Sequence, residues 1–205
     1  MRLFVAALML LALSTAVVKG QGSSEISSAT LKSVRLPLVS NGHLTGSSIS
    51  LQELIDKHPR IILNFVSARC EHSRQQLDSI SGVLQGKIKD RNHGAKSAPI
   101  AVVFVDKSLA RIHRALKKIP PTVLVFWDKG SELSKLLKVK LTPTVVVLDR
   151  DAKLKGIYEG FFAPTEAYRD FFAKLVEAVI RGSRLPPRPV HLQLSSGEGN
   201  CIPAG

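Results

Sequence analysis

The stretch Ile61-Ile62-Leu63-Asn64-Phe65-Val66-Ser67-Ala68-Arg69-Cys70-Glu71-His72-Ser73-Arg74 decides how this chain is organised. Its first half is an apolar run, typical of a strand buried on both faces of a sheet. After the cysteine the sequence turns polar, and apolar residues then recur at helical spacing from Leu77 to Ile88. The pattern predicts a strand over 60–66, a turn, and a helix over 73–88, with a thiol at the junction.

The rest of the chain alternates between strand and helix patterns. Apolar segments predict further strands at 99–105, 122–126, 142–148 and 153–158. Periodic or capped segments predict helices at 51–57, 108–119, 131–137 and 164–180. A hairpin from 36–39 to 45–50 precedes them as an N-terminal extension. This order of elements predicts an α/β fold with a central mixed sheet flanked by helices.

Both ends of the chain differ in composition from this central part. Residues 1–20 have a positive start, an apolar core and small residues, which predicts a signal peptide and export to the periplasm or the extracellular space. Membrane association is expected only if this leader stays uncleaved. We expect a flexible Ser-rich lead-in at 21–35, a domain at 36–182 and a flexible Pro-containing tail at 183–205 that carries Cys201.

The formal net charge of +13 raises the question of an acidic partner. The densest basic group lies on the helix predicted at 108–119 and just before it: Lys107, Arg111, Arg114, Lys117 and Lys118. No aromatic residues interleave with these cations, so the pattern favours a solvated helix face, and we expect no nucleic-acid partner. The glycine patterns that bind phosphates are absent, so no nucleotide cofactor is expected.

The chain has two cysteines, Cys70 and Cys201. A cysteine attacks as a thiolate, which a helix N-terminus or a nearby cation stabilises. Cys70 is predicted at such a helix start, with Arg69, His72 and Arg74 beside it and Glu71 opposing them. These neighbours make Cys70 the candidate reactive residue.

Four segments together carry a resemblance to a known family: Asn64 to Cys70, Leu141-Thr142-Pro143-Thr144, Val147 to Lys153, and Glu159-Gly160. The chain resembles the thioredoxin-like superfamily over residues 36–180. Within it, the chain is similar to the exported redoxin branch typified by TlpA-like thiol–disulfide proteins.

The resemblance implies roles for particular residues. Cys70 would be the attacking thiol, Pro143 would follow a cis peptide bond beside it, and the backbone of Thr142 would pair with an extended peptide or protein thiol/disulfide substrate. The sequence departs from the family at Ser73, which stands in place of the second cysteine, and at Arg69, which stands in place of a tryptophan. We therefore expect Cys70, Ser73 and Pro143 to form the catalytic site, supported by Arg69, His72 and Thr142.

With Ser73 in place of a thiol, three fates of Cys70 stay open. An external thiol resolves its mixed disulfide, Cys201 acts as the resolving thiol, or the two cysteines form a stable disulfide. Monothiol exchange is the expected function. The alternatives are a non-catalytic binding or assembly module and a one-cysteine peroxidase, the latter suggested by Ser67 three residues before Cys70. A copper site at Cys70 with His72, or with His113 or Cys201, is disfavoured because related copper proteins use two cysteines, so no metal is expected.

Overall fold

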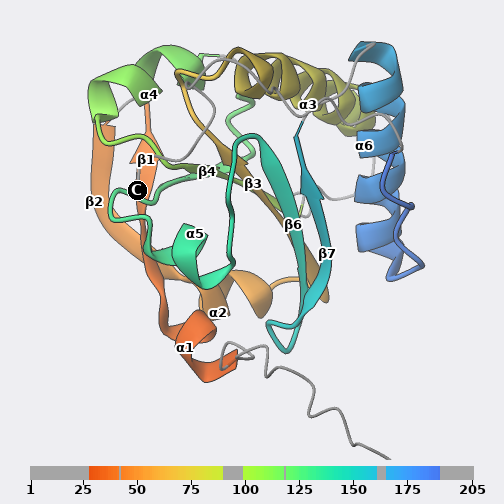
Figure 1. Ribbon diagram of the computed structural model, residues 1–205, viewed down its shortest axis with the longest axis horizontal. Helices are drawn as coiled ribbons and strands as arrows, with labels where there is room; N and C mark the ends of the chain where they lie inside the picture. The colour runs from red at the N-terminus through yellow and green to blue at the C-terminus, as the bar shows by residue number, and fades with distance from the viewer. Residues whose placement is uncertain (1–27, 42, 90–98, 118, 161–164, 190–205) are drawn as a thin grey trace, which may run out of the picture.

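The computed structural model describes residues 28–41, 43–89, 99–117, 119–160 and 165–189, and they form a mixed sheet covered by helices (Figure 1). The helices are α1 (Ser28–Ser33), α2 (Leu51–Ile55), α3 (Glu71–Lys89), α4 (Leu109–Leu116), α5 (Glu132–Leu136) and α6 (Thr165–Arg181). The strands are β1 (Arg35–Ser40), β2 (His43–Ser50), β3 (Arg60–Val66), β4 (Ile100–Phe104), β5 (Leu124–Trp127), β6 (Thr144–Asp149) and β7 (Leu154–Glu159). The α/β fold with a mixed central sheet is therefore confirmed.

The seven strands form one sheet in the order β2-β1-β5-β4-β3-β6-β7. The central strands β3, β4 and β5 run parallel, and β6 pairs antiparallel with β3 on its other side. The β1–β2 and β6–β7 hairpins form the two edges. Because parallel strands end at the same edge of a sheet, the residues that follow β3 and β4 meet there.

The sheet separates two apolar clusters, one on each face. The first cluster packs α3, α4 and α6 on one face, and the second packs α1, α2 and α5 on the other. Side chains alternate along β3, so Ile62 and Val66 enter the first cluster while Leu63 and Phe65 enter the second. All four are fully buried, which explains why this strand is apolar throughout.

The expected helix start at Ser50 is present in detail. The Ser50 hydroxyl accepts a hydrogen bond from the backbone N–H of Glu53, and the Glu53 carboxylate accepts one from the backbone N–H of Ser50. This reciprocal capping box satisfies two N–H groups that the helix itself leaves without partners. At the other end of the domain, Gly182 adopts a φ of 66° directly after α6, the left-handed conformation that favours glycine there.

The flexible lead-in expected at 21–35 is corrected in its described part. Residues 28–33 form α1, and Leu31 and Val34 are buried against the second cluster. These two aliphatic side chains anchor a stretch whose polar composition suggested flexibility. The rest of the lead-in, like the predicted signal peptide, lies outside the described residues.

The first part of the expected tail is also packed rather than flexible. Leu185 packs against the first cluster, and the Tyr158 hydroxyl donates to the carbonyl of Pro186 at 2.8 Å. The prolines exclude a helix here, as expected, but they leave the chain free to run along β7. Cys201 lies beyond the described residues. Among the described helices, none combines the length and apolar character needed to cross a membrane.

Candidate functional site

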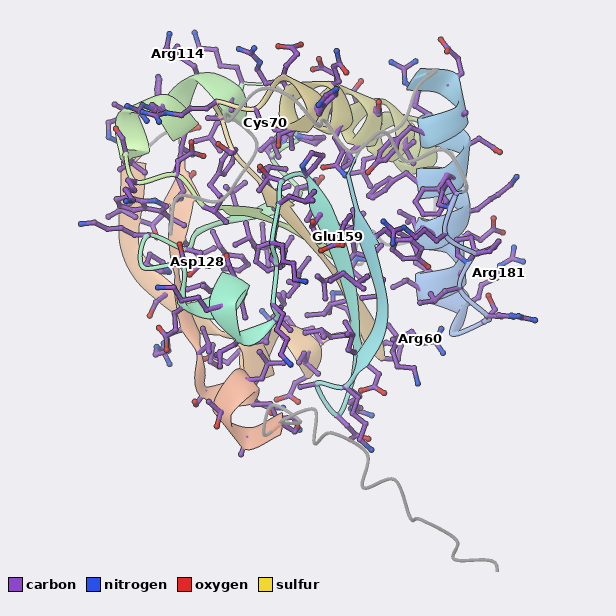
Figure 2. The ribbon with its side chains drawn as sticks, viewed as in Figure 1. Arg60, Cys70, Arg114, Asp128, Glu159 and Arg181 are labelled. Atoms are coloured by element: carbon purple, nitrogen blue, oxygen red, sulfur yellow. The ribbon has the colours of Figure 1, made fainter. Side chains whose placement is uncertain are left out.

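Cys70 lies where β3 gives way to α3, as the sequence predicted (Figure 2). Its backbone N–H donates to the carbonyl of Ser67, and its own carbonyl accepts from the N–H of Arg74, both at 3.1 Å. Cys70 therefore caps the first turn of α3 and is fully buried. Because the first N–H groups of a helix carry partial positive charge, this position favours an anionic sulfur.

The turn that leads into Cys70 is held by Asp106, the second residue after β4. The Asp106 carboxylate accepts hydrogen bonds from the Ser67 hydroxyl at 3.1 Å and from the backbone N–H of Ala68 at 2.8 Å. Ser67 Oγ in turn accepts from the N–H of Arg69 at 3.3 Å. Three successive residues before Cys70 are thus tied directly or indirectly to one carboxylate.

Asp106 is itself held in place and nearly fully buried. The indole N–H of Trp127, at the end of β5, donates to the Asp106 carbonyl at 2.6 Å. Burial raises the pKa of the Asp106 carboxyl, and the bonds from Ala68 and Ser67 and the charges of Arg111 and Arg69 oppose that rise. Asp106 thus links the Cys70 turn, through its carboxylate, to β5, through its backbone carbonyl. No local pattern in the sequence marks this residue as part of the site.

Ser73 occupies the position of the missing second cysteine and is fully buried. Its hydroxyl oxygen accepts a hydrogen bond from the backbone N–H of Ser67 at 3.2 Å. In this arrangement Ser73 stabilises the turn before Cys70. It carries no thiol that could resolve a mixed disulfide.

Thr142 and Pro143 lie beside Cys70 although they are far from it in sequence. The Cys70 Sγ atom is 3.4 Å from the carbonyl oxygen of Thr142. The Thr142–Pro143 peptide bond is cis, as the resemblance implied. The carbonyl of Pro143 accepts from the N–H of Gly160 at 2.8 Å, and Thr144 pairs with Phe65 at the start of β6. These bonds fix the segment next to the end of β3.

Cys70 is disulfide-bonded, so the part of the chain that the structure describes contains no free cysteine. The sequence contains one other cysteine, Cys201, which lies outside the described residues. A disulfide sulfur carries no hydrogen, so the approach of Cys70 Sγ to Thr142 is a van der Waals contact in this state. When Cys70 is reduced, the same geometry lets its thiol donate to the Thr142 carbonyl.

The charged and titratable residues expected around Cys70 differ in their contacts and exposure. Arg74 forms an exposed ion pair with Glu71 on the first turn of α3, so its charge is shared with that carboxylate. Arg69 is exposed, and its charge acts on Asp106, the carboxylate that holds the turn. His72 is half-buried, on the first turn of α3.

The histidine considered as a distant metal ligand lies elsewhere. His113 is on α4, where its ring contacts that of His43 edge-on. Among the described residues, no three His, Cys, Asp or Glu side chains gather as a metal site would require.

A buried polar layer lies between β3 and the helices that cover it. The Gln76 amide donates to the hydroxyl of Tyr168, a fully buried side chain whose pKa is raised by that burial. Both amide atoms of Asn64 and the Gln76 oxygen have no hydrogen-bond partner among the described residues. Asn64 lies between Val102 of β4 and Val145 of β6, and neither side chain can supply one. An amide flanked by two valines is costly to bury.

No family model matches the sequence, and no curated protein matches it. Solved structures do match. One is a secreted Mycobacterium tuberculosis disulfide oxidoreductase homologous to E. coli DsbE, with a TM-score of 0.55, 12% identity, and coverage of 73% of this chain and 98% of that one. Another is a candidate thiol:disulfide interchange protein DsbE from Chlorobium tepidum, with a TM-score of 0.53, 21% identity, and coverage of 73% and 95%.

A third similar structure is the bacterioferritin comigratory protein of Xanthomonas campestris, for which alkyl peroxide reduction is described. Its TM-score is 0.53 at 15% identity, and the match covers 73% of this chain and 94% of that one. All three identities are low, so the matches concern the arrangement of elements. The chain therefore has the fold of the thioredoxin-like redoxin superfamily, with Cys70 at the strand–helix junction and Pro143 after a cis peptide bond.

Proposed function

We propose that this chain is an exported thiol–disulfide exchange protein in which Cys70 attacks the substrate and Cys201 is its disulfide partner. The observation that carries the proposal is the state and place of Cys70: disulfide-bonded, at the N-terminus of α3, and 3.4 Å from the Thr142 carbonyl. The similar structures named as disulfide oxidoreductases and interchange proteins support the same class of reaction.

The choice of Cys201 follows from the local chemistry. Ser73 cannot form a disulfide, and its hydroxyl is engaged by the Ser67 N–H. Cys201 is the one other cysteine in the sequence. It is separated from Cys70 by about 130 residues, and the entropy of closing a loop grows only logarithmically with its length. A tail cysteine can therefore replace the neighbouring cysteine of a dithiol motif.

When the protein acts as a reductant, the exchange takes two successive thiolate attacks. The Cys70 thiolate forms a bond to one sulfur of the substrate disulfide, and the other substrate sulfur leaves as a thiolate. The Cys201 thiolate then attacks Cys70 Sγ, which forms the intramolecular disulfide and releases the second substrate sulfur. The substrate gains two electrons and the two cysteines lose two. An external dithiol, itself oxidised to a disulfide, returns the protein to its starting state.

The substrate in this proposal is an extended peptide segment of a protein. A substrate sulfur that reaches Cys70 Sγ must pass beside Thr142, because that residue's carbonyl already lies 3.4 Å from the sulfur. Export is supported by the leader-like composition of residues 1–20 and by the disulfide itself, since disulfides persist mainly in oxidising compartments.

The peroxidase alternative rests on Ser67, and the contacts of that residue give it another role. Its hydroxyl donates to Asp106 and accepts from the Arg69 N–H, so Ser67 is part of the turn that carries Cys70. Thiol exchange is therefore the function that the geometry supports best.

A turnover assay tests the proposal. Reduction of insulin by dithiothreitol should be accelerated by the wild type, and Cys70→Ser should fall to the uncatalysed rate. Cys201→Ser should be slower than the wild type, because dithiothreitol must then resolve the mixed disulfide itself. Acceleration that survives Cys70→Ser would overturn the proposal. Binding of peptide without any acceleration would favour the non-catalytic module, and Cys70-dependent consumption of peroxide without insulin reduction would favour the peroxidase.

A further inference from the structure

A surface with one sign of charge lies next to the Cys70 turn. Its cations are Arg111, Arg114 and Lys117 on α4 and its C-cap, and we call it the α4 basic face. Arg114 and Lys117 are exposed and Arg111 is half-buried. The first turn of α4 contains no acidic residue, and Asp106 is the single acid in the sequence between Asp90 and Asp128.

Asp106, the acid that precedes α4 in the sequence, is turned inward. Asp106 is nearly fully buried and is committed to Ser67 and Ala68. The charge of Arg111 nevertheless reaches it and lowers its pKa against the effect of burial. Arg111 is thus close enough to act on the carboxylate that holds the Cys70 turn. Figure 2 shows Arg114 and Cys70 at the same end of the molecule.

Elsewhere among the described residues, several cations are paired with acids. Ion pairs join Glu71 to Arg74 on α3, Asp170 to Lys174 on α6, and Glu177 to Arg181 on α6. Two more lie around the β6–β7 turn, and none of the pairs between described residues includes a cation of the α4 basic face. No ion pair between described residues therefore neutralises the cations of the α4 basic face.

A pocket of about 310 Å³ opens along the same helix, between α4 and the β1–β2 hairpin. Its floor is made by the aliphatic side chains of Val39, Val123 and Val125, which are buried. Its rim includes His113 and Lys117, the latter being one of the cations of the face. A pocket with an apolar floor and a cationic rim suits an apolar side chain that is followed or preceded by carboxylates.

We propose that the α4 basic face and this pocket dock an acidic segment, carrying an apolar anchor side chain, of the protein whose disulfide reacts at Cys70. The inference rests on the proposed function and adds the chemistry of the partner. The positive face raises the local concentration of an acidic partner, and the pocket fixes where its segment lies.

Nucleic acids and anionic lipid layers fit the α4 basic face less well than an acidic protein segment does. The sequence from Lys107 to Ile119, which includes α4, has no Phe, Tyr or Trp side chain on which nucleic-acid bases could stack. The large hydrophobic side chains exposed among the described residues, Leu44 and Leu154, lie on separate strands and form no continuous surface for a lipid layer. Neither Leu44 nor Leu154 lines the pocket.

The test uses the Cys201→Ser protein, so that the reaction stops at the mixed disulfide and one rate is measured. Two disulfide peptides of equal length are compared, one with Glu residues and a Leu anchor and one with Gln at the same places. The α4 variant combines Arg111→Gln, Arg114→Gln and Lys117→Gln. The control variant combines Lys153→Gln, Lys174→Gln and Arg181→Gln, three exposed cations away from α4 that remove the same charge.

At about 0.01 M salt, the protein with an unchanged α4 basic face should form the mixed disulfide with the acidic peptide roughly tenfold faster than the α4 variant does. The rate of the control variant should fall less than about twofold. The difference should vanish at about 1 M salt, where the Debye length is about 3 Å. Equal losses in the two variants would overturn the inference, since net charge alone would then explain the rate.

A binding arm separates failure of the inference from failure of the proposed function. A cysteine-free copy of the acidic peptide is titrated against the Cys70→Ser protein and against the same protein with the α4 substitutions. Weaker binding to the α4 variant supports the surface even if no peptide ever forms a mixed disulfide. If a single-stranded oligonucleotide or a phosphatidylserine vesicle binds more tightly than the acidic peptide through the same three cations, the proposed partner is wrong.

Discussion

The Cys70 Sγ atom lies 3.4 Å from the carbonyl oxygen of Thr142, although 72 residues separate the two in sequence. The first lies just after β3 and the second just before β6, two strands that pair antiparallel. Their pairing brings the candidate nucleophile and the candidate peptide-binding backbone to one edge of the sheet.

Cys201→Ser should expose a thiol that the wild type does not show. With no sulfur available for an intramolecular disulfide, Cys70 should be alkylated by iodoacetamide without prior reduction, whereas the non-reduced wild type should take up none. Intact mass spectrometry measures the uptake. If non-reduced Cys201→Ser also resists alkylation after denaturation, the sulfur bonded to Cys70 does not come from Cys201.

Ser73→Cys in the Cys201→Ser background should restore a local partner for Cys70. Ser73 is fully buried one helical turn from Cys70, so a thiol there can form the disulfide that the wild type lacks. Loss of the oxygen that accepts from the Ser67 N–H should cost about 1 kcal/mol of unfolding free energy. Peptide mapping detects the new disulfide, and Ser73→Ala in the same background is the matched control. Absence of a closed disulfide after oxidation would show that position 73 cannot face Cys70.

Asp106→Asn should change how stability depends on pH. Burial raises the folded-state pKa of Asp106 above its ordinary value of 3.8, so the protonated form is favoured on folding. The resulting stability is fully present below that ordinary value and is lost as pH rises through the raised pKa. The unfolding free energy of the wild type, measured in urea, should therefore fall relative to Asp106→Asn as the pH rises above the ordinary carboxyl pKa of 3.8. A difference that grows in favour of the wild type over the same rise in pH would contradict this sign.

Asp106→Asn should also slow the reaction of Cys70. An amide can keep one of the two acceptor positions but turns an N–H₂ group toward Ser67 or Ala68, both of which donate to the carboxylate. The turn should loosen, and the rate of mixed-disulfide formation should drop by roughly tenfold, measured on the reduced Cys201→Ser protein. Asp149→Asn, at a turn away from Cys70, is the control for removal of one negative charge. An equal drop in both variants would mean that charge, not the Asp106 hydrogen bonds, sets the rate.

Asn64→Val should not destabilise the protein. Neither amide atom of Asn64 has a hydrogen-bond partner among the described residues, and its neighbours in the sheet are Val102 and Val145. Removal of an unsatisfied buried amide should leave the unfolding free energy unchanged or raise it by about 1 kcal/mol. A loss of more than about 1 kcal/mol in urea denaturation would indicate that the amide is satisfied in solution, by water for instance.

The elements around Cys70 could be predicted because each has a local signal. The apolar run set the bounds of β3 at Arg60 and Val66, and the capping box marked the start of α2. The cis bond before Pro143 came from the resemblance rather than from a local signal. For β3 and α2, the residues that carry the signal are neighbours in the sequence.

The parts that could not be predicted depend on contacts between distant segments. Asp106 is one of many acids in the sequence, and its role emerges only when the ends of β3 and β4 meet. Leu31 and Leu185 lie in stretches of polar or Pro-rich composition, and only their neighbours in the fold show that they are packed. The disulfide state of Cys70 likewise has no local signal, because no second cysteine stands near it in the sequence.

The most direct test of the central claim is the mass of the species formed when reduced protein meets an excess of a disulfide peptide. The account predicts a stable mixed disulfide at Cys70 in Cys201→Ser. In the wild type the same adduct should form and then be replaced by an intramolecular Cys70–Cys201 disulfide, and Cys70→Ser should form no adduct at position 70. An adduct on Cys201 in Cys70→Ser that forms as fast as the Cys70 adduct, or a wild-type adduct that never resolves, would contradict the account.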